Sequence, residues 1–169
     1  MTGDDRPEPP YLGDETETLA GFLDFHRATL LWKLEGLDDE QLRRAMVPSG
    51  TSLLGLVKHL AYVERSWFQG VWDGQEVSFP WTKEDPDADW RIETDESTKD
   101  ILDLYNGECD RSREIVAKAA SLDEVVQHPR HTEWSMSRRW ILTHMVEETA
   151  RHVGHADILR EQLDGATGE

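Results

Sequence analysis

The segment SRRWILTHMVEETARHVGHADILREQL, residues 137–163, carries the clearest structural pattern in the chain. Its side chains repeat at spacings of four and three residues, as one face of a helix requires. The inward face so defined consists of Ile141, Met145, Glu148, His152, His155 and Leu159. A carboxylate and two imidazoles therefore interrupt an apolar seam, and their burial is unfavourable unless they are paired or bind a metal.

Glu148 and His152 have a spacing that suits one shared ion. Four residues along an ideal helix correspond to about 40° in azimuth and about 6 Å in rise, so the two side chains can bind one ion together. His144 and His152 are eight residues apart, about 12 Å along the axis, which is too far for both to bind one ion directly. The spacing thus indicates Glu148 with one imidazole.

Three earlier segments have the same helical periodicity and are predicted as helices over residues 14–35, 51–71 and 97–120. The inward side of the first predicted helix contains Leu19, Phe22, Leu23, His26 and Leu30. Residues 74–97 contain two prolines and two tryptophans without periodicity, which predicts a long connection. Long helices with one long crossover favour an all-α four-helix bundle, and such bundles hold metal sites in their cores.

The length of 169 residues favours one domain. We expect a single domain over residues 14–163. The Pro-rich residues 1–13 are expected to form a flexible arm, and residues 164–169 a short tail.

Composition excludes several classes of function. The formal net charge is −17, which disfavours binding to nucleic acid or to an anionic lipid surface. No apolar run approaches the length of a membrane span, so we expect a cytoplasmic protein. Cys109 is the single cysteine, which excludes an internal disulfide and leaves nitrogen and oxygen ligands for a metal. Its position on an apolar stripe between Glu108 and Asp110 indicates a core residue instead of a nucleophile.

A third metal ligand must come from another helix. His59, in the segment VKHLAYVERSW, lies about one turn from Leu56 and Val63 on the apolar side, and His26 is a weaker candidate. Two imidazoles and one carboxylate would leave a position open, as in catalytic zinc sites, and they also suit iron, nickel or manganese. The alternative is that the inward histidines are hydrogen-bonded core residues. His128 and His131 fall in a polar loop and are expected to be solvated.

Two long stretches resemble the DinB/YfiT-like metalloenzyme family, in particular its actinobacterial branch. They are LDDEQLRRAMVPSGTSLLGLVKHLAYVERSWF, residues 37–68, and WSMSRRWILTHMVEETARHVGHADILRE, residues 134–161. The resemblance implies an up-down-down-up four-helix bundle, a homodimer, and a metal bound by His59, Glu148 and His152. Many members have histidine at the position of Glu148, and the His-Glu-His set is similar to that of mycothiol-dependent isomerases.

The family's usual glutamine is replaced by His155, so the resemblance implies that His155 and the neighbouring His144 line the pocket or support the ligands. It further implies a metal-dependent thiol-S-transferase with zinc as the first choice of metal, mycothiol as cosubstrate and a small electrophile as partner. We expect residues 74–97, with Trp81, Trp90 and the nearby Trp72, to shape the electrophile's pocket. No catalytic residue is assigned beyond the metal ligands.

Four other functions stay open at this point. They are a mycothiol-dependent isomerase, a metal-dependent hydrolase, a stress-response protein that binds a metal or small ligand without turnover, and a purely structural bundle. A metal-dependent hydrolase would use the ion to lower the pKa of a bound water. A structural bundle would satisfy its polar seam residues with one another.

Overall fold

The computed structural model describes residues 5–168 and is mostly helical. Residues 1–4 of the predicted arm and residue 169 of the predicted tail lie outside the described residues. The long helices are α1 (Glu15–Trp32), α3 (Leu53–Glu64), α4 (Thr98–Ala117) and α5 (Arg138–Asp164). The predicted all-α class agrees with this structure, to which β1 (Val125–Gln127) and β2 (Ser135–Ser137) add a small antiparallel sheet in which Val126 pairs with Met136.

Side-chain caps explain where the long helices begin. Asp14 and Glu17 form a reciprocal capping box at α1, and Ser97 and Asp100 form another at α4. The hydroxyl of Ser137 accepts a hydrogen bond from a backbone N–H in the first turn of α5. At the other end of α5, Gly165 adopts φ 77°, a left-handed conformation that favours glycine and ends the helix.

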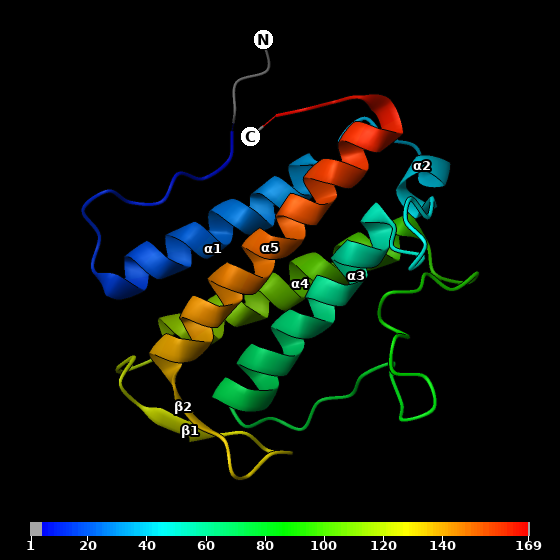
Figure 1. Cartoon of the computed structure of the whole chain (residues 1–169). Coiled ribbons are helices and arrows are strands. Elements are labelled where there is room, and N and C mark those ends of the chain that lie inside the picture. The colour runs from blue at the N-terminus through cyan, green and yellow to red at the C-terminus, as the bar shows by residue number, and fades with distance from the viewer. Residues whose placement is uncertain (1–4, 169) are drawn as a thin grey trace.

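The long helices lie side by side along most of the molecule (Figure 1). α1 packs against α5, α3 packs against α4, and α3 also contacts α5. In Figure 1, α1 and α5 run in one direction, and α3 and α4 run in the other. Residues 73–97 therefore return along the molecule from one end to the other, and the short helix α2 (Asp39–Arg43) lies at the end where α3 begins. In residues 5–168, no helix combines the length and apolar character that crossing a membrane requires.

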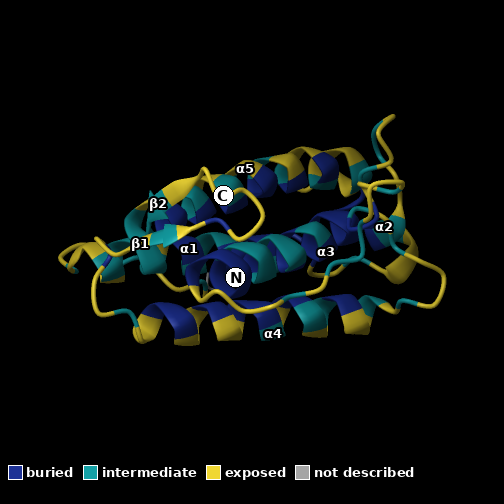
Figure 2. Ribbon diagram, turned by 90° about the horizontal axis from the view of Figure 1, so that it is seen from below, coloured by how far each residue is buried: buried dark blue, intermediate teal, exposed yellow. Residues whose placement is uncertain are grey.

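The buried sides of the helices face one another, as Figure 2 shows, and form two apolar clusters. One cluster contains Leu30, Leu60 and Ala156, and the other contains Leu23, Phe68 and Met145. Along each long helix, buried polar residues separate the positions that belong to the two clusters. These polar residues are Arg27, Glu64, Ser112, Thr149 and His152. Arg27 and Glu64 neutralise each other through two hydrogen bonds, of 2.8 Å from Nε and 2.6 Å from Nη2.

A π-helix, η1 (Arg65–Trp72), directly continues α3. Its hydrogen bonds span five residues, as in the bond from the Asp73 amide to the Phe68 carbonyl. More residues therefore fit into each turn, and each residue advances less around the axis than in an α-helix. Such segments occur frequently at functional sites.

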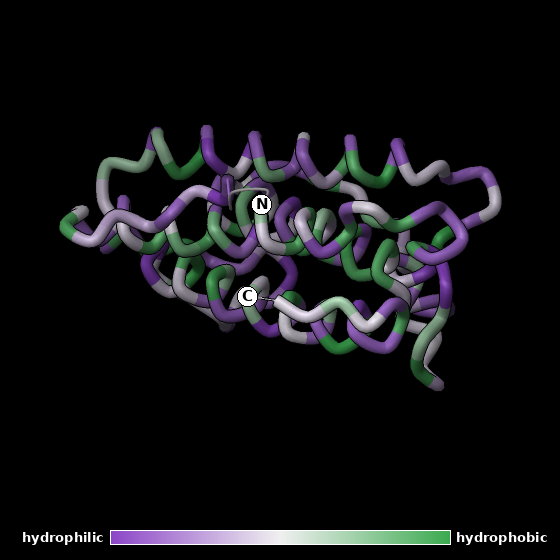
Figure 3. Tube along the Cα trace, turned by 90° about the horizontal axis from the view of Figure 1, so that it is seen from above, coloured by the Kyte–Doolittle hydropathy of each residue, from purple (hydrophilic) through white to green (hydrophobic). Residues whose placement is uncertain are grey.

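Outward-facing positions of the helices are mainly hydrophilic, which Figure 3 shows most clearly along α4. The prediction that Phe22 faces inward is wrong, because its side chain is 44% exposed. The described part of the N-terminal segment lies against α1. There the Arg6 guanidinium donates to the Thr29 hydroxyl and lies over the Trp32 ring.

Candidate metal centre

Three predicted ligands meet between α3 and α5. His59, Glu148 and His152 each place one ligand atom within 4.8 Å of the others. Glu148 Oε1 lies 3.2 Å from Nε2 of His152 and 3.8 Å from Nε2 of His59. Both imidazoles therefore direct the same ring nitrogen toward one carboxylate oxygen.

The other ring nitrogen of His59 has a partner that the sequence did not indicate. Nδ1 of His59 lies 2.7 Å from Oδ2 of Asp89, a buried carboxylate in the long connection. A proton on Nδ1 donated to this carboxylate leaves the lone pair of Nε2 free for a metal. Metal-bound histidines commonly have such a carboxylate partner, which fixes the tautomer and the ring orientation.

Trp90, the next residue, covers one side of the His59 ring. The two rings are stacked, with centroids 3.8 Å apart and an interplanar angle of 17°. The same indole meets the His152 ring edge-on, with centroids 5.4 Å apart. Trp90 therefore restricts both imidazoles and shields one side of the His59 ring from solvent.

His155 lies beside His152, with the two Nδ1 atoms 3.3 Å apart. Its side chain is exposed, so the prediction that His155 continues the inward seam of α5 is wrong. Partial loss of hydration, followed by the neighbouring charges of His152 and Arg151, lowers the pKa of His155. His155 thus contacts one candidate ligand without joining the three converging ligand atoms.

Electrostatics favour a negative Glu148. The hydrogen bond with His152 and the nearby imidazole of His59 hold the pKa of Glu148 well below its usual range, although burial acts in the opposite direction. For His59, burial opposes the charged form, but the hydrogen bond to Asp89 and the nearby carboxylate of Glu148 outweigh it and raise the pKa of His59. A cation bound here would replace the proton between the imidazole and the carboxylate.

The donor set fits a divalent transition metal. Two imidazole nitrogens and one carboxylate oxygen form the three-ligand set of many catalytic zinc sites, in which a further position stays open. Asp89, which contacts Nδ1 of His59, supplies the carboxylate that typically supports a metal-bound histidine in such sites. Ligand type alone also permits iron, nickel or manganese.

Two further predicted residues lie apart from the three ligand atoms. His144 stacks on Trp140, with centroids 5.0 Å apart, and its Nδ1 lies 3.4 Å from Glu147. His26 is on α1, beside Phe25, and burial lowers the pKa of His26.

The prediction that His128 is solvated is wrong. Its side chain is 6% exposed, and Nδ1 accepts hydrogen bonds from the backbone N–H groups of Arg130 and His131. His131 itself is exposed, in agreement with the prediction.

The three tryptophans predicted to shape a pocket have different environments. Trp90 contacts the metal centre, as described above. Trp72 is 3% exposed and belongs to an apolar cluster of the core. Trp81 stacks on Phe79, with centroids 4.2 Å apart. Of the three, Trp90 is the one in contact with the candidate ligands.

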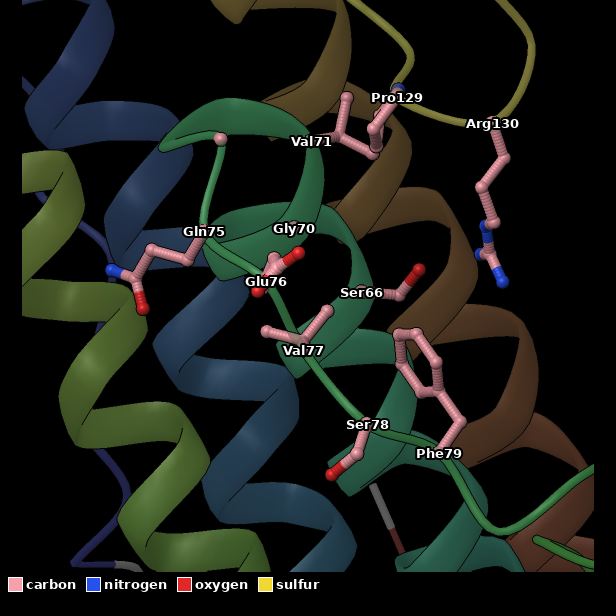
Figure 4. A pocket seen from close by; sticks show the side chains of 11 residues that line it. Ser66, Gly70, Val71, Gln75, Glu76, Val77, Ser78, Phe79, Pro129 and Arg130 are labelled. Carbon is pink, nitrogen blue, oxygen red and sulfur yellow. The ribbon is translucent and has the colours of Figure 1, made fainter.

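Two cavities differ in their relation to this centre. A cavity of about 310 Å³ is bounded by Trp90 and His155, which both touch candidate ligands, and by apolar residues that include Leu159. A cavity of about 570 Å³ lies between η1, the long connection and the β1–β2 turn, where Figure 4 shows Phe79 and Arg130 beside it. None of its lining residues is a candidate ligand.

Comparisons with known proteins identify the fold and the family of the chain. A crystal structure of a conserved protein from Enterococcus faecalis is similar over 92% of this chain and 100% of that chain, with a TM-score of 0.64. At 15% sequence identity this likeness shows the fold alone. No curated protein matches the chain significantly. The sequence model of the mycothiol-S-transferases matches residues 18–165, which is most of the chain, and the protein therefore belongs to the mycothiol-S-transferase family.

Proposed function

We propose that this protein is a metal-dependent thiol-S-transferase, in which His59, Glu148 and His152 bind one divalent ion, zinc being the first choice. The cosubstrates are a low-molecular-weight thiol such as mycothiol and a small electrophile. The observation that carries the proposal is the convergence of the three ligand atoms within 4.8 Å, in a chain of the mycothiol-S-transferase family.

A divalent ion in this set would stabilise the thiolate form of a bound thiol near neutral pH, and the thiolate is the nucleophilic form. The protein's own residues prepare that state. Glu148 supplies a negative ligand, Asp89 fixes the ring of His59, and Trp90 shields it from solvent. Three protein ligands leave room for a sulfur atom.

In a substitution, the sulfur forms a bond to the electrophilic carbon, and the leaving group departs with the electron pair of the bond that breaks. The thiol proton passes to solvent. In an addition to an activated double bond, the neighbouring carbon takes up a proton instead, and nothing leaves.

The proposal includes the up-down-down-up order of a four-helix bundle over residues 14–163. The opposite directions of the α1–α5 and α3–α4 pairs in Figure 1 support it. It also includes a homodimer, which the family resemblance supports. It places the protein in the cytoplasm, because a free thiol cosubstrate needs a reducing compartment.

Metal content tests the ligand assignment. Elemental analysis of tag-free protein should find one ion per chain in the wild type and in His26→Ala, and loss of the ion in His59→Ala and His152→Ala. His26→Ala is the matched control, because it removes a half-buried imidazole from α1, away from the centre. Absence of metal from the wild type even after reconstitution would refute the proposal.

Turnover tests the reaction. Metal-loaded wild type should accelerate conjugation of a thiol to 1-chloro-2,4-dinitrobenzene above the rate of the free thiol, and His152→Ala should not. Metal without acceleration would favour a non-catalytic binding protein. Ester hydrolysis in the absence of thiol would favour a hydrolase.

A further inference from the structure

Three tryptophans surround a cavity of about 540 Å³, and none of the three candidate metal ligands lines it. It lies where η1, β2 and the first turn of α5 meet, and its lining consists of Trp67, Trp134, Ser135, Met136, Ser137 and Trp140. Trp134 is 51% exposed and Trp140 is 49% exposed. Large indoles gathered around one accessible cavity, instead of being scattered singly, are characteristic of a binding surface.

His144 connects this cavity to the metal centre. Its ring stacks on Trp140 and meets Trp67 edge-on, with centroids 4.8 Å apart. Trp140, His144 and Glu148 follow one another at spacings of four residues along α5, so the stripe from the cavity to the carboxylate spans about 12 Å. A molecule whose aromatic part occupies the cavity therefore reaches the metal centre only if its reactive group extends about 12 Å along this stripe.

The π-helix contributes to the position of Trp67. In a regular α-helix, the eight residues from His59 to Trp67 would leave the two side chains about 80° apart around the axis. Within η1 each residue turns less, so Trp67 stays closer to the side of α3 that carries His59. Its contacts with His144 and with Trp140, at 5.5 Å between centroids, place it against α5.

The β1–β2 turn supports the opposite wall. His131 stacks on Trp134, with centroids 4.4 Å apart, and His128 meets Trp67 edge-on at 6.2 Å. The hydrogen bonds of the buried His128 to the turn backbone hold this segment together. Trp134 is therefore presented by an ordered element.

We propose that this tryptophan pocket binds the planar aromatic part of the electrophile. The inference rests on the proposed thiol-transfer function and names its substrate class. No charged side chain lines the pocket, and indole rings favour stacking with other aromatic rings. The net charge of −17 disfavours anionic compounds, and the lining offers a cation no carboxylate partner, so the occupant is a neutral aromatic molecule.

A binding experiment tests the pocket without turnover. The probe is 1,3-dinitrobenzene, which has no leaving group, titrated calorimetrically into metal-loaded protein without thiol. Trp134→Ala and Trp140→Ala should each weaken its binding about ten-fold, because each removes a stacking surface. Ile158→Ala is the matched control, since Ile158 is 55% exposed and lines the separate cavity next to His155. Its binding of the probe should equal that of the wild type.

Three results would overturn the inference: no saturable binding to the wild type, unchanged binding in both tryptophan variants, or an equal loss in Ile158→Ala. Because Trp134 and Trp140 are half exposed, their replacement should leave the protein folded, and thermal melting of each variant checks this.

A kinetic experiment separates this inference from the proposed function. The KM for N-(4-phenylbutyl)iodoacetamide, in which a flexible chain separates the phenyl ring from the reactive carbon, should rise about ten-fold in the tryptophan variants, whereas the kinetics with the small aliphatic electrophile iodoacetamide should stay unchanged. Equal effects on both electrophiles would contradict an aromatic pocket. If the wild type accelerates neither reaction, thiol transfer fails as a function, and the binding of 1,3-dinitrobenzene still decides whether the pocket exists.

Discussion

Nδ1 of His59 lies 2.7 Å from Oδ2 of Asp89, and this contact joins helix α3 to the long connection. The connection thereby becomes part of the candidate metal centre. Lys58, the residue before His59, strengthens the junction, because its Nζ donates to the carbonyl of Arg91 at 2.7 Å and to Glu96 at 2.8 Å.

Asp89→Asn should weaken metal binding about ten-fold to one hundred-fold, because the amide no longer holds His59 through a charged acceptor. The measurement is a zinc titration against a competing chelator. Asp87→Asn is the control, since it removes the same charge from an exposed position two residues away. Equal affinities of the two variants would contradict a supporting role for Asp89.

Cys109 should be inert in the folded protein. Its side chain is 2% exposed, and burial followed by the charge of Glu64 raises the pKa of its thiol far above the usual value. Iodoacetamide should therefore modify native wild type much more slowly than a Cys109→Ala/Asp110→Cys variant, whose new thiol is exposed. Equal rates, followed by mass spectrometry, would show that the thiol is accessible.

The same pKa shift predicts a direction for stability against pH. The thiol pKa is higher in the folded than in the unfolded chain, so the unfolded chain loses this proton first. The contribution of Cys109 to the free energy of unfolding is therefore fully present below the unfolded pKa of about 8.5 and declines as pH rises above it. Urea titrations of the wild type and Cys109→Ala between pH 7 and 10 should show a steeper loss in the wild type.

Arg27 and Glu64 form a buried ion pair whose two partners should depend on each other. Glu64→Leu removes the buried carboxylate that pairs with Nε and Nη2 of Arg27 and leaves the guanidinium only the partly exposed Asp24, so it should cost about 3–5 kcal/mol of unfolding free energy. The double variant Arg27→Met/Glu64→Leu should recover most of this loss. Asp24→Asn is the control, because Asp24 binds the same guanidinium at 2.9 Å from a partly exposed position and should cost less than about 1 kcal/mol. Additive effects in urea denaturation would contradict this coupling.

The helices and the converging ligands could be predicted because they depend on local spacing. The four-residue interval between Glu148 and His152 places both side chains on one side of α5 wherever that helix packs. The apolar residues around His59 on α3 made it a candidate beside His26, and the family resemblance implied the choice of His59. Phe22 shows the limit of this reasoning, because periodicity identifies an apolar side of a helix but not how far a neighbouring helix covers it.

The connection over residues 74–97 was predicted, but its contacts and the hairpin could not be, because these contacts are made between distant segments. Asp89 lies in a stretch without periodicity, so nothing near it in sequence pointed to His59. Strands of three residues, such as Val125–Gln127, are too short to show a reliable alternation. His128 has polar sequence neighbours, yet the fold brings Trp67 and Trp134 against it.

Gly55 should matter to the metal centre although it is not a ligand. A Cβ at this position would lie 2.5 Å from the carbonyl oxygen of Trp90. Gly55→Ala must therefore push the connection away from α3, which separates Asp89 from His59. Unfolding free energy should fall by about 1–3 kcal/mol through overpacking, and zinc affinity should fall about ten-fold.

Gly154→Ala distinguishes this steric effect from a general effect of replacing a helical glycine. A Cβ at Gly154 meets nothing within 4 Å, so alanine there should raise the unfolding free energy by up to about 1 kcal/mol through its higher helix propensity. Zinc affinity should stay at the wild-type value. Chelator competition and urea denaturation on both variants give the comparison. If Gly55→Ala were as stable and bound zinc as tightly as Gly154→Ala, the close approach of α3 to Trp90 would not be what positions Asp89.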